Sequence, residues 1–185
     1  MNNLKQLTIE QHKNAERQNF VQMMFKGKLT DEQYSLYLWN QHACYDILEA
    51  LAMMNGLFND IPNIRRAPRI LEDAKELWPE DKDIKIMPSV REYLKYVTTL
   101  ADDPQKLMAH VYVRHMGDLS GGQMLAKRIP GNGTYYQFDC DVKEYKEKIR
   151  NKCTDDMADE AKTVFNFATA LFKDLEDEFN LEQSN

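Results

Sequence analysis

The chain has 185 residues, of which 43% are hydrophobic and 29% are charged, as expected for one globular domain rather than a disordered segment. A net charge of −6 argues against nucleic acid as the main partner. No window approaches the roughly 20 apolar residues of a membrane span, and the N-terminal stretch MNNLKQLTIEQHK lacks the apolar core of a signal peptide. We therefore expect a single domain over residues 1–185, soluble and cytoplasmic.

Helix signals follow one another along the chain, and no alternating strand pattern persists. Helical composition runs from Leu4 to about Phe25, and a capping box of Thr30 and Gln33 starts a helix that should reach about Asn55. The clearest loop is IPGNGTYYQF at 129–138. Further helices are predicted from 68 to before Pro79, at 88–101, from Pro104 through the segment that contains three glycines, at 141–152, and from a cap at Thr154 to about Phe179. The pattern predicts an all-α fold.

The stretch HMGDLSGGQML, residues 115–125, places three glycines within six residues of an otherwise helical segment. Each glycine inside a helix costs roughly 1 kcal/mol relative to alanine, so propensity alone favours a turn. If the segment is instead helical, positions 117, 120, 121 and 124 form a face almost without side chains. Backbone could then approach a large flat ligand, with the carboxylate of Asp118 at its edge and Arg114 within reach of it, one turn away.

Four histidines are candidates for metal binding, and none belongs to an HExxH motif. His12 and Glu16 are one helical turn apart, so the carboxylate could orient an imidazole that binds metal through its other nitrogen. The alternative is an ordinary exposed pair. The cysteines are odd in number and form no CxxC motif, which predicts reduced, partly buried thiols: Cys44, Cys140 and Cys153.

Two further patterns each allow two interpretations. The stretch KEYKEKIRNK at 143–152 is either a solvated helix or a cationic rim for an acidic ligand, with Lys146 and Arg150 on one face. Phenylalanines spaced seven apart on the last helix either pack in the core or line an apolar pocket: Phe165, Phe172 and Phe179.

Together these motifs resemble the heme oxygenase family. GDLSGGQ at 117–123 is similar to the family's distal-helix signature, and AHVYVRHMGDLSGGQML extends the likeness upstream. LKQLTIEQHKNAE at 4–16 is similar to its proximal-helix motif. YKEKIR at 145–150 and EAKTVFNFATALFKDLEDEF at 160–179 resemble its later helices. The likeness covers nearly the whole chain in the same order.

The resemblance implies a multi-helical fold in which heme b is sandwiched between a proximal and a distal helix. It makes His12 the iron ligand and Glu16 the hydrogen-bonded neighbour of that ligand. Gly117 and Gly121 correspond to the glycines that pack on the distal heme face, and Asp118 to the carboxylate that organises distal water. Tyr112 and Arg114 correspond to members of the polar network. The cations near the propionates correspond to Lys5, Lys146 and Arg150. If the phenylalanines of the last helix line a pocket, Phe165 is expected to contact the heme.

The implied activity is oxidative cleavage of heme by O2 to biliverdin, Fe(II) and CO. No flavin or nicotinamide motif is present, so a partner protein must supply the electrons. We expect a small ferredoxin, docked at basic residues that include Arg65, Arg66 and Arg69. The alternatives are a non-catalytic protein that stores or senses heme, which would not need Asp118, and a related scaffold that acts on another small molecule, which would not need His12.

One position departs from the family pattern. His115 stands where an aromatic residue such as tyrosine is more usual, and we expect it to alter the hydrogen bonds near Asp118. Membrane-anchored animal members of the family carry an apolar C-terminal tail, whereas this chain ends NLEQSN, which predicts a soluble form.

Overall fold

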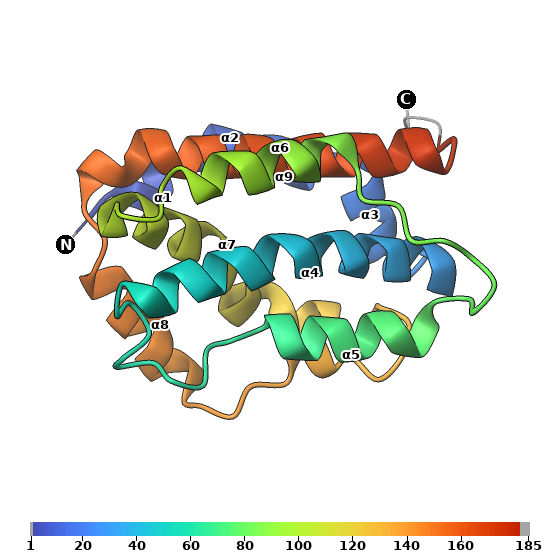
Figure 1. Ribbon diagram of the computed structural model, residues 1–185, viewed down its shortest axis with the longest axis horizontal. Helices are drawn as coiled ribbons and strands as arrows, with labels where there is room; N and C mark the ends of the chain where they lie inside the picture. The colour runs from blue at the N-terminus through green and yellow to red at the C-terminus, as the bar shows by residue number, and fades with distance from the viewer. Residues whose placement is uncertain (1, 182–185) are drawn as a thin grey trace.

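The computed structural model describes residues 2–181, and all regular structure within that range is helical. The helices lie side by side as an elongated bundle, in which α9, α6 and α2 form the upper layer of Figure 1 and α4 and α5 lie below them. In chain order they are α1 (Leu4–Leu7), α2 (Ile9–Glu16), α3 (Asn19–Phe25), α4 (Asp31–Met54), α5 (Ala67–Leu77), α6 (Pro88–Thr98), α7 (Pro104–Leu125), the 3₁₀ turn η1 (Thr134–Tyr136), α8 (Val142–Asn151), the 3₁₀ turn η2 (Asp155–Met157) and α9 (Ala158–Glu178). The prediction of an all-α fold is confirmed.

The N-terminal segment differs from the single helix predicted for it. It forms three short helices, with breaks at Thr8 and at Gln18. The hydroxyl of Thr8 donates to the carbonyl of Leu4 at 2.8 Å, a local bond that competes with regular helix geometry. Gln18 has extended backbone, with φ −60° and ψ 141°, and so ends one helix and begins the next. These breaks set the direction of α2, which carries His12.

The helix predicted from Thr30 is confirmed in both its start and its end. Thr30 accepts a hydrogen bond from the backbone of Gln33, whose side chain accepts in turn from the backbone of Thr30. The helix ends at Met54, with Asn55 as its C-cap. α4 is buried along much of its length and packs against α5, α6 and α7.

The glycine-rich stretch is helical, so the turn that propensity favours is not formed. α7 runs unbroken from Pro104 to Leu125, and the carboxylate of Asp103 caps it by accepting from the backbone of Lys106. Apolar side chains before and between the glycines, such as Val111 and Leu119, are buried in the core. Packing against α4, α8 and α9 therefore outweighs the poor intrinsic propensity of the stretch.

Two other segments differ from expectation. The predicted loop at 129–138 contains η1, where Tyr135 and Tyr136 are buried. Thr154 does not cap the last α-helix directly, because η2 intervenes and α9 begins at Ala158. α9 then runs to Glu178, packing against α2, α3, α6 and α7, and so joins the two ends of the chain.

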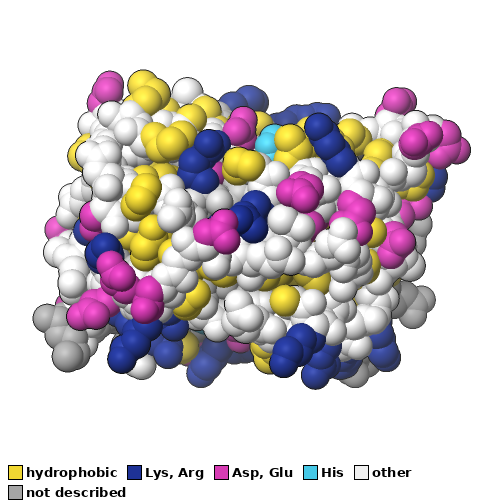
Figure 2. Space-filling model, turned by 90° about the horizontal axis from the view of Figure 1, so that it is seen from below, with side chains coloured by type: hydrophobic (Ala, Val, Ile, Leu, Met, Phe, Trp, Pro, Cys, Tyr) yellow, Lys and Arg dark blue, Asp and Glu magenta, His cyan; other side chains and the backbone are white. Residues whose placement is uncertain are grey.

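Across residues 2–181, we find no helix with both the length and the apolar character needed to cross a membrane. Residues 182–185 of the polar ending lie outside the described part of the chain. Figure 2 shows the face that looks downward in Figure 1, where Lys and Arg side chains gather along one long edge and acidic side chains are scattered elsewhere. The net charge of −6 is therefore not evenly distributed.

Candidate functional site

The two glycines singled out on α7 face open space. Apart from its chain neighbours and the backbone of its own helix, a Cβ atom added at Gly117 or at Gly121 would meet no atom of the described residues within 4 Å. Gly122 differs, since a Cβ there would lie 2.6 Å from the ring of Tyr136. We call the surface of Gly117, Ser120 and Gly121 the glycine face. It is a bare strip on a helix whose other sides are largely buried.

Asp118 lies beside this strip and is held by two tyrosines. The hydroxyl of Tyr45 on α4 donates to one carboxylate oxygen at 2.6 Å, and that of Tyr135 in η1 donates to the other at 2.9 Å. Burial raises the pKa of Asp118 to about 6, although the nearby His115, both tyrosine hydroxyls and Arg66 oppose the rise. The site therefore contains a carboxyl group that can gain or lose a proton near neutral pH.

His115, the departure from the family pattern, is fully buried against Glu49. Its Nε2 lies 2.9 Å from a carboxylate oxygen of Glu49, and both side chains have 0% exposure. Burial raises the pKa of Glu49, but the hydrogen bonds from His115 and from the backbone of Arg66 and Ala67 outweigh it and leave that pKa below its usual value. The expected change in the hydrogen bonds near Asp118 thus takes the form of a buried acid–imidazole pair.

Arg114 does not bind Asp118, although the spacing of the two residues suggested that it could. Its Nε donates to the hydroxyl of Tyr93 at 3.2 Å, and one terminal nitrogen lies 3.5 Å from the side-chain oxygen of Gln41. Tyr93 also contacts His110 at 2.8 Å. Arg114 therefore belongs to a second polar network, because α6 offers it a nearer acceptor.

Tyr112 lies on another side of α7. At about 100° per residue, its side chain is roughly 120° away from that of Asp118 around the helix axis. It packs against a core cluster that includes Tyr145 and Cys153. Burial raises the pKa of Tyr112, Cys153 raises it further and Arg150 lowers it. Its membership of a polar network around Asp118 stays a prediction.

The imidazole of His12 is oriented by two neighbours. Its Nε2 lies 2.8 Å from a carboxylate oxygen of Glu16, and its ring stacks on Phe165 of α9 at 5.2 Å between centroids. The side chain is 43% exposed, so its surface is open on the remaining side. Glu16 and Phe165 fix the ring while Nδ1 has no partner among the described residues.

No carboxylate within residues 2–181 pairs with the three cations predicted to bind an acidic ligand: Lys5, Lys146 and Arg150. Two nearby lysines of the same region do have carboxylate partners. Lys148 pairs with Glu144, and Lys152 pairs with Asp60. Lys5 and Arg150 are exposed and Lys146 is half-buried, and all three lack such a partner. They are therefore available to an external anion.

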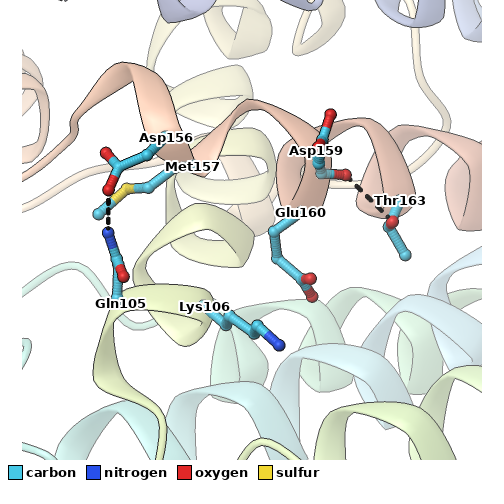
Figure 3. A pocket seen from close by; sticks show the side chains of 7 residues that line it. All are labelled: Gln105, Lys106, Asp156, Met157, Asp159, Glu160 and Thr163. Carbon is cyan, nitrogen blue, oxygen red and sulfur yellow. Dashed lines mark hydrogen bonds between the residues drawn. The ribbon is translucent and has the colours of Figure 1, made fainter.

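A polar cavity of about 280 Å³ lies at the other end of α7 (Figure 3). Lys106 of α7 lies opposite Glu160 of α9 in it, and Asp159 also lines it. Lys106 and Gly117 are eleven residues apart on one helix, a separation of about 16 Å along its axis. This cavity is therefore distinct from the glycine face.

The comparisons with known proteins decide the family. The heme oxygenase family model matches residues 1–174. The chain belongs to the heme oxygenase family. It is 29% identical to a heme oxygenase 2 of Synechocystis sp. PCC 6803 over 201 residues, 92% of this chain and 80% of that one. It is 28% identical to heme oxygenase 1 of Bos taurus, covering 94% of this chain and 70% of that one.

Solved structures of heme oxygenases share the fold. The heme oxygenase-1 of Synechocystis sp. PCC 6803 in complex with heme matches with a TM-score of 0.82 and 26% identity, over 96% of this chain and 92% of that one. The heme oxygenase of Leptospira interrogans matches with a TM-score of 0.81 and 28% identity, over 91% of this chain and 96% of that one. The predicted heme oxygenase fold is therefore confirmed.

The sequence did not reveal three residues that surround the glycine face. Tyr45, Glu49 and Tyr135 all contact Asp118 or His115. Glu49 is a charged residue within the apolar stripe of α4, which is a signal of a buried partner. The paired tyrosines in the glycine-containing loop at 129–138 are a similar signal, because large aromatic residues seldom occupy a fully solvated loop.

Proposed function

We propose that this heme oxygenase binds heme b between His12 and the glycine face and cleaves it with O2 to biliverdin, Fe(II) and CO. The observation that carries the proposal is the glycine face itself. Gly117 and Gly121 cost helix stability, and no neighbouring element within residues 2–181 packs against the space where their Cβ atoms would lie. A titratable carboxyl group lies buried beside them. A flat ligand in van der Waals contact with that strip would supply the missing packing.

His12 has the features of an axial ligand. Glu16 and the ring of Phe165 fix the imidazole plane, and the nitrogen without a protein partner is available to iron. A neutral imidazole lacks the electron donation by which a thiolate favours O–O cleavage. Bound heme supplies both the iron that activates O2 and the porphyrin carbon that is oxidised.

Asp118 is proposed to hold a water at the distal side and to exchange a proton with it. Both carboxylate oxygens accept from tyrosine hydroxyls, which fixes the plane of the group. Its pKa of about 6 suits a group that carries a proton part of the time near neutral pH. A fixed acid that acts through water delivers protons one at a time, whereas a free supply would favour unproductive O–O cleavage.

Lys5, Lys146 and Arg150 are proposed to bind the heme propionates. Their lack of carboxylate partners supports this role, since charge-assisted bonds to propionates would fix which edge of the porphyrin lies under the distal side.

The electron donor is proposed to be a small ferredoxin. The predicted docking patch needs correction, because Arg66 is 1% exposed and its guanidinium donates to backbone carbonyls of Tyr135 and Gln137. Arg69 pairs with Asp139, and Arg65 lies 3.5 Å from Glu49. Three free cysteines, two of them buried, support a cytoplasmic location, which is also part of the proposal.

The test is a turnover assay on the purified protein. Hemin is added and the Soret band recorded, and then ferredoxin, its reductase and NADPH are supplied. We expect the Soret band to disappear as biliverdin absorption grows. Asp118→Ala should bind hemin but lose about 10²-fold in biliverdin formation, a typical effect of removing a proton-transfer group. A stable heme complex without biliverdin would indicate a non-catalytic binder, and no Soret shift would exclude both heme functions.

A further inference from the structure

Two hydrogen bonds join α4 to α7 beside Asp118. Tyr45 donates to Asp118 at 2.6 Å, and Glu49 binds His115 at 2.9 Å. Tyr45 and Glu49 are one turn apart on α4, and His115 and Asp118 are three residues apart on α7, so the two bonds are consecutive links between the same two helices. The ring of Tyr45 also contacts that of His115, at 5.1 Å between centroids. The position of Asp118 relative to α4 therefore depends on both bonds.

Glu49 is also linked, through the start of α5, to Tyr135, the second tyrosine that binds Asp118. Its carboxylate accepts from the backbone N–H groups of Arg66 at 2.6 Å and of Ala67 at 3.0 Å, where α5 begins. The guanidinium of Arg66 donates to the carbonyl of Tyr135 at 2.8 Å, and the Tyr135 hydroxyl donates to Asp118. Glu49 therefore supports both tyrosines that hold the carboxylate, one on its own helix and one through Arg66.

His115 also acts on the charge of the cluster. Burial raises the pKa of Asp118, and among the influences that lower it the proximity of His115 is the largest. The titratable and charged groups that interact with Asp118 are Tyr34, Tyr37 and Tyr45 from α4, Arg66 from the start of α5, Tyr135 and Tyr136 from η1, and His115 from α7 itself. Glu49 of α4 binds that histidine. A phenyl ring at position 115 would remove the influence of His115 and leave Arg66 as the cation that lowers the pKa of Asp118.

We propose that His115 is a positioning residue for heme cleavage, which fixes the tyrosines around Asp118 through Glu49 and favours the ionised form of that carboxylate. The inference rests on the proposed role of Asp118. His115 itself need not contact heme.

Two variants separate the structural effect from the electrostatic one. His115→Gln retains an N–H donor for Glu49 but has no imidazole, and His115→Phe removes both the donor and the imidazole. In the ligand-free protein with ¹³C-labelled aspartate, NMR follows the titration of Asp118, assigned by the loss of its signal in Asp118→Asn. We expect a midpoint near pH 6 in the wild type and a rise of about one unit in both variants. Amide exchange at Ala67 should accelerate only in His115→Phe.

His110→Gln is the matched control, since His110 is also a fully buried histidine of α7 that binds a glutamate, Glu160. Its Asp118 midpoint should equal that of the wild type. In turnover assays, kcat is measured against pH. In His115→Gln, which we expect to stay folded, the acid limb of that plot should shift by the same amount as the Asp118 midpoint. An unchanged midpoint in folded His115→Gln, or an acid limb that does not follow it, overturns the proposal. If the wild type forms no biliverdin, the proposed function fails, while the titration still decides whether His115 acts on Asp118.

Discussion

Asp118 is a carboxyl group whose ionisation costs free energy. Its pKa is raised from 3.8 to about 6, with burial as the main cause. The native state therefore holds the proton more tightly than the unfolded chain, and stability falls as pH rises from about 4 to about 6. At 1.36 kcal/mol per unit, the cost above pH 6 is about 3 kcal/mol. A buried group retained at such a cost is typical of a functional site.

We predict that Asp118→Asn stabilises the ligand-free protein more at pH 7.5 than at pH 4.5. The amide carries no charge, so the variant escapes the cost of ionising a buried acid, and the stability difference between variant and wild type should grow by about 2 kcal/mol between the two pH values. Urea unfolding at both pH values measures it. A difference independent of pH would show that Asp118 titrates normally in the folded protein.

His12 leads to a separate prediction. His12→Ala should retain the fold, because the side chain is 43% exposed, but should lose heme affinity and biliverdin formation. Added imidazole should restore part of the activity by occupying the vacated position. The control is Glu16→Gln, which keeps the ligand and alters only its hydrogen bond. Full activity of His12→Ala without imidazole would exclude His12 as the working ligand.

At the scale of the element, α4 shows where sequence reasoning succeeds and α7 shows where it fails. The caps and apolar spacing of α4 predict its bounds, because the signals are local. The glycine stretch could not be assigned from propensity, since its helicity depends on burial between α4, α8 and α9. The partners of Asp118 could not be predicted either, because Tyr45 and Tyr135 come from segments 73 and 17 residues away along the chain. The spacing of the glycines and the family motif pointed to Asp118, but neither named the residues that hold it.

Adjacent glycines of α7 should respond in opposite ways to alanine. Gly121→Ala adds a methyl group in open space, so the ligand-free helix should gain up to about 1 kcal/mol, while heme affinity falls. Gly122→Ala places its Cβ 2.6 Å from the ring of Tyr136, so the protein should lose about 1–3 kcal/mol. Urea unfolding and hemin titration measure both effects. Equal responses at the two positions would mean that the glycine face is not an open surface.

At the scale of the whole molecule, α9 supports both sides of the proposed site. α2, which carries His12, and α7, which carries the glycine face, both pack on α9, and Phe165 of α9 stacks on His12. Heme bound between α2 and α7 would therefore add contacts to helices that share one support. A ligand that binds only the native state stabilises it by about 2.7 kcal/mol at one hundred times its Kd.

The most direct test of this account is hydrogen exchange along α7 with and without heme. Gly117 and Gly121 lower helix propensity, and within residues 2–181 no neighbouring element packs within 4 Å of where their Cβ atoms would lie. Amides at 115–125 should therefore exchange faster than the rest of α7 in the ligand-free protein. Heme should slow these amides far more than those at 104–114. Equally slow exchange of 115–125 in both states would contradict the account, because the glycines would then have no energetic connection to the ligand.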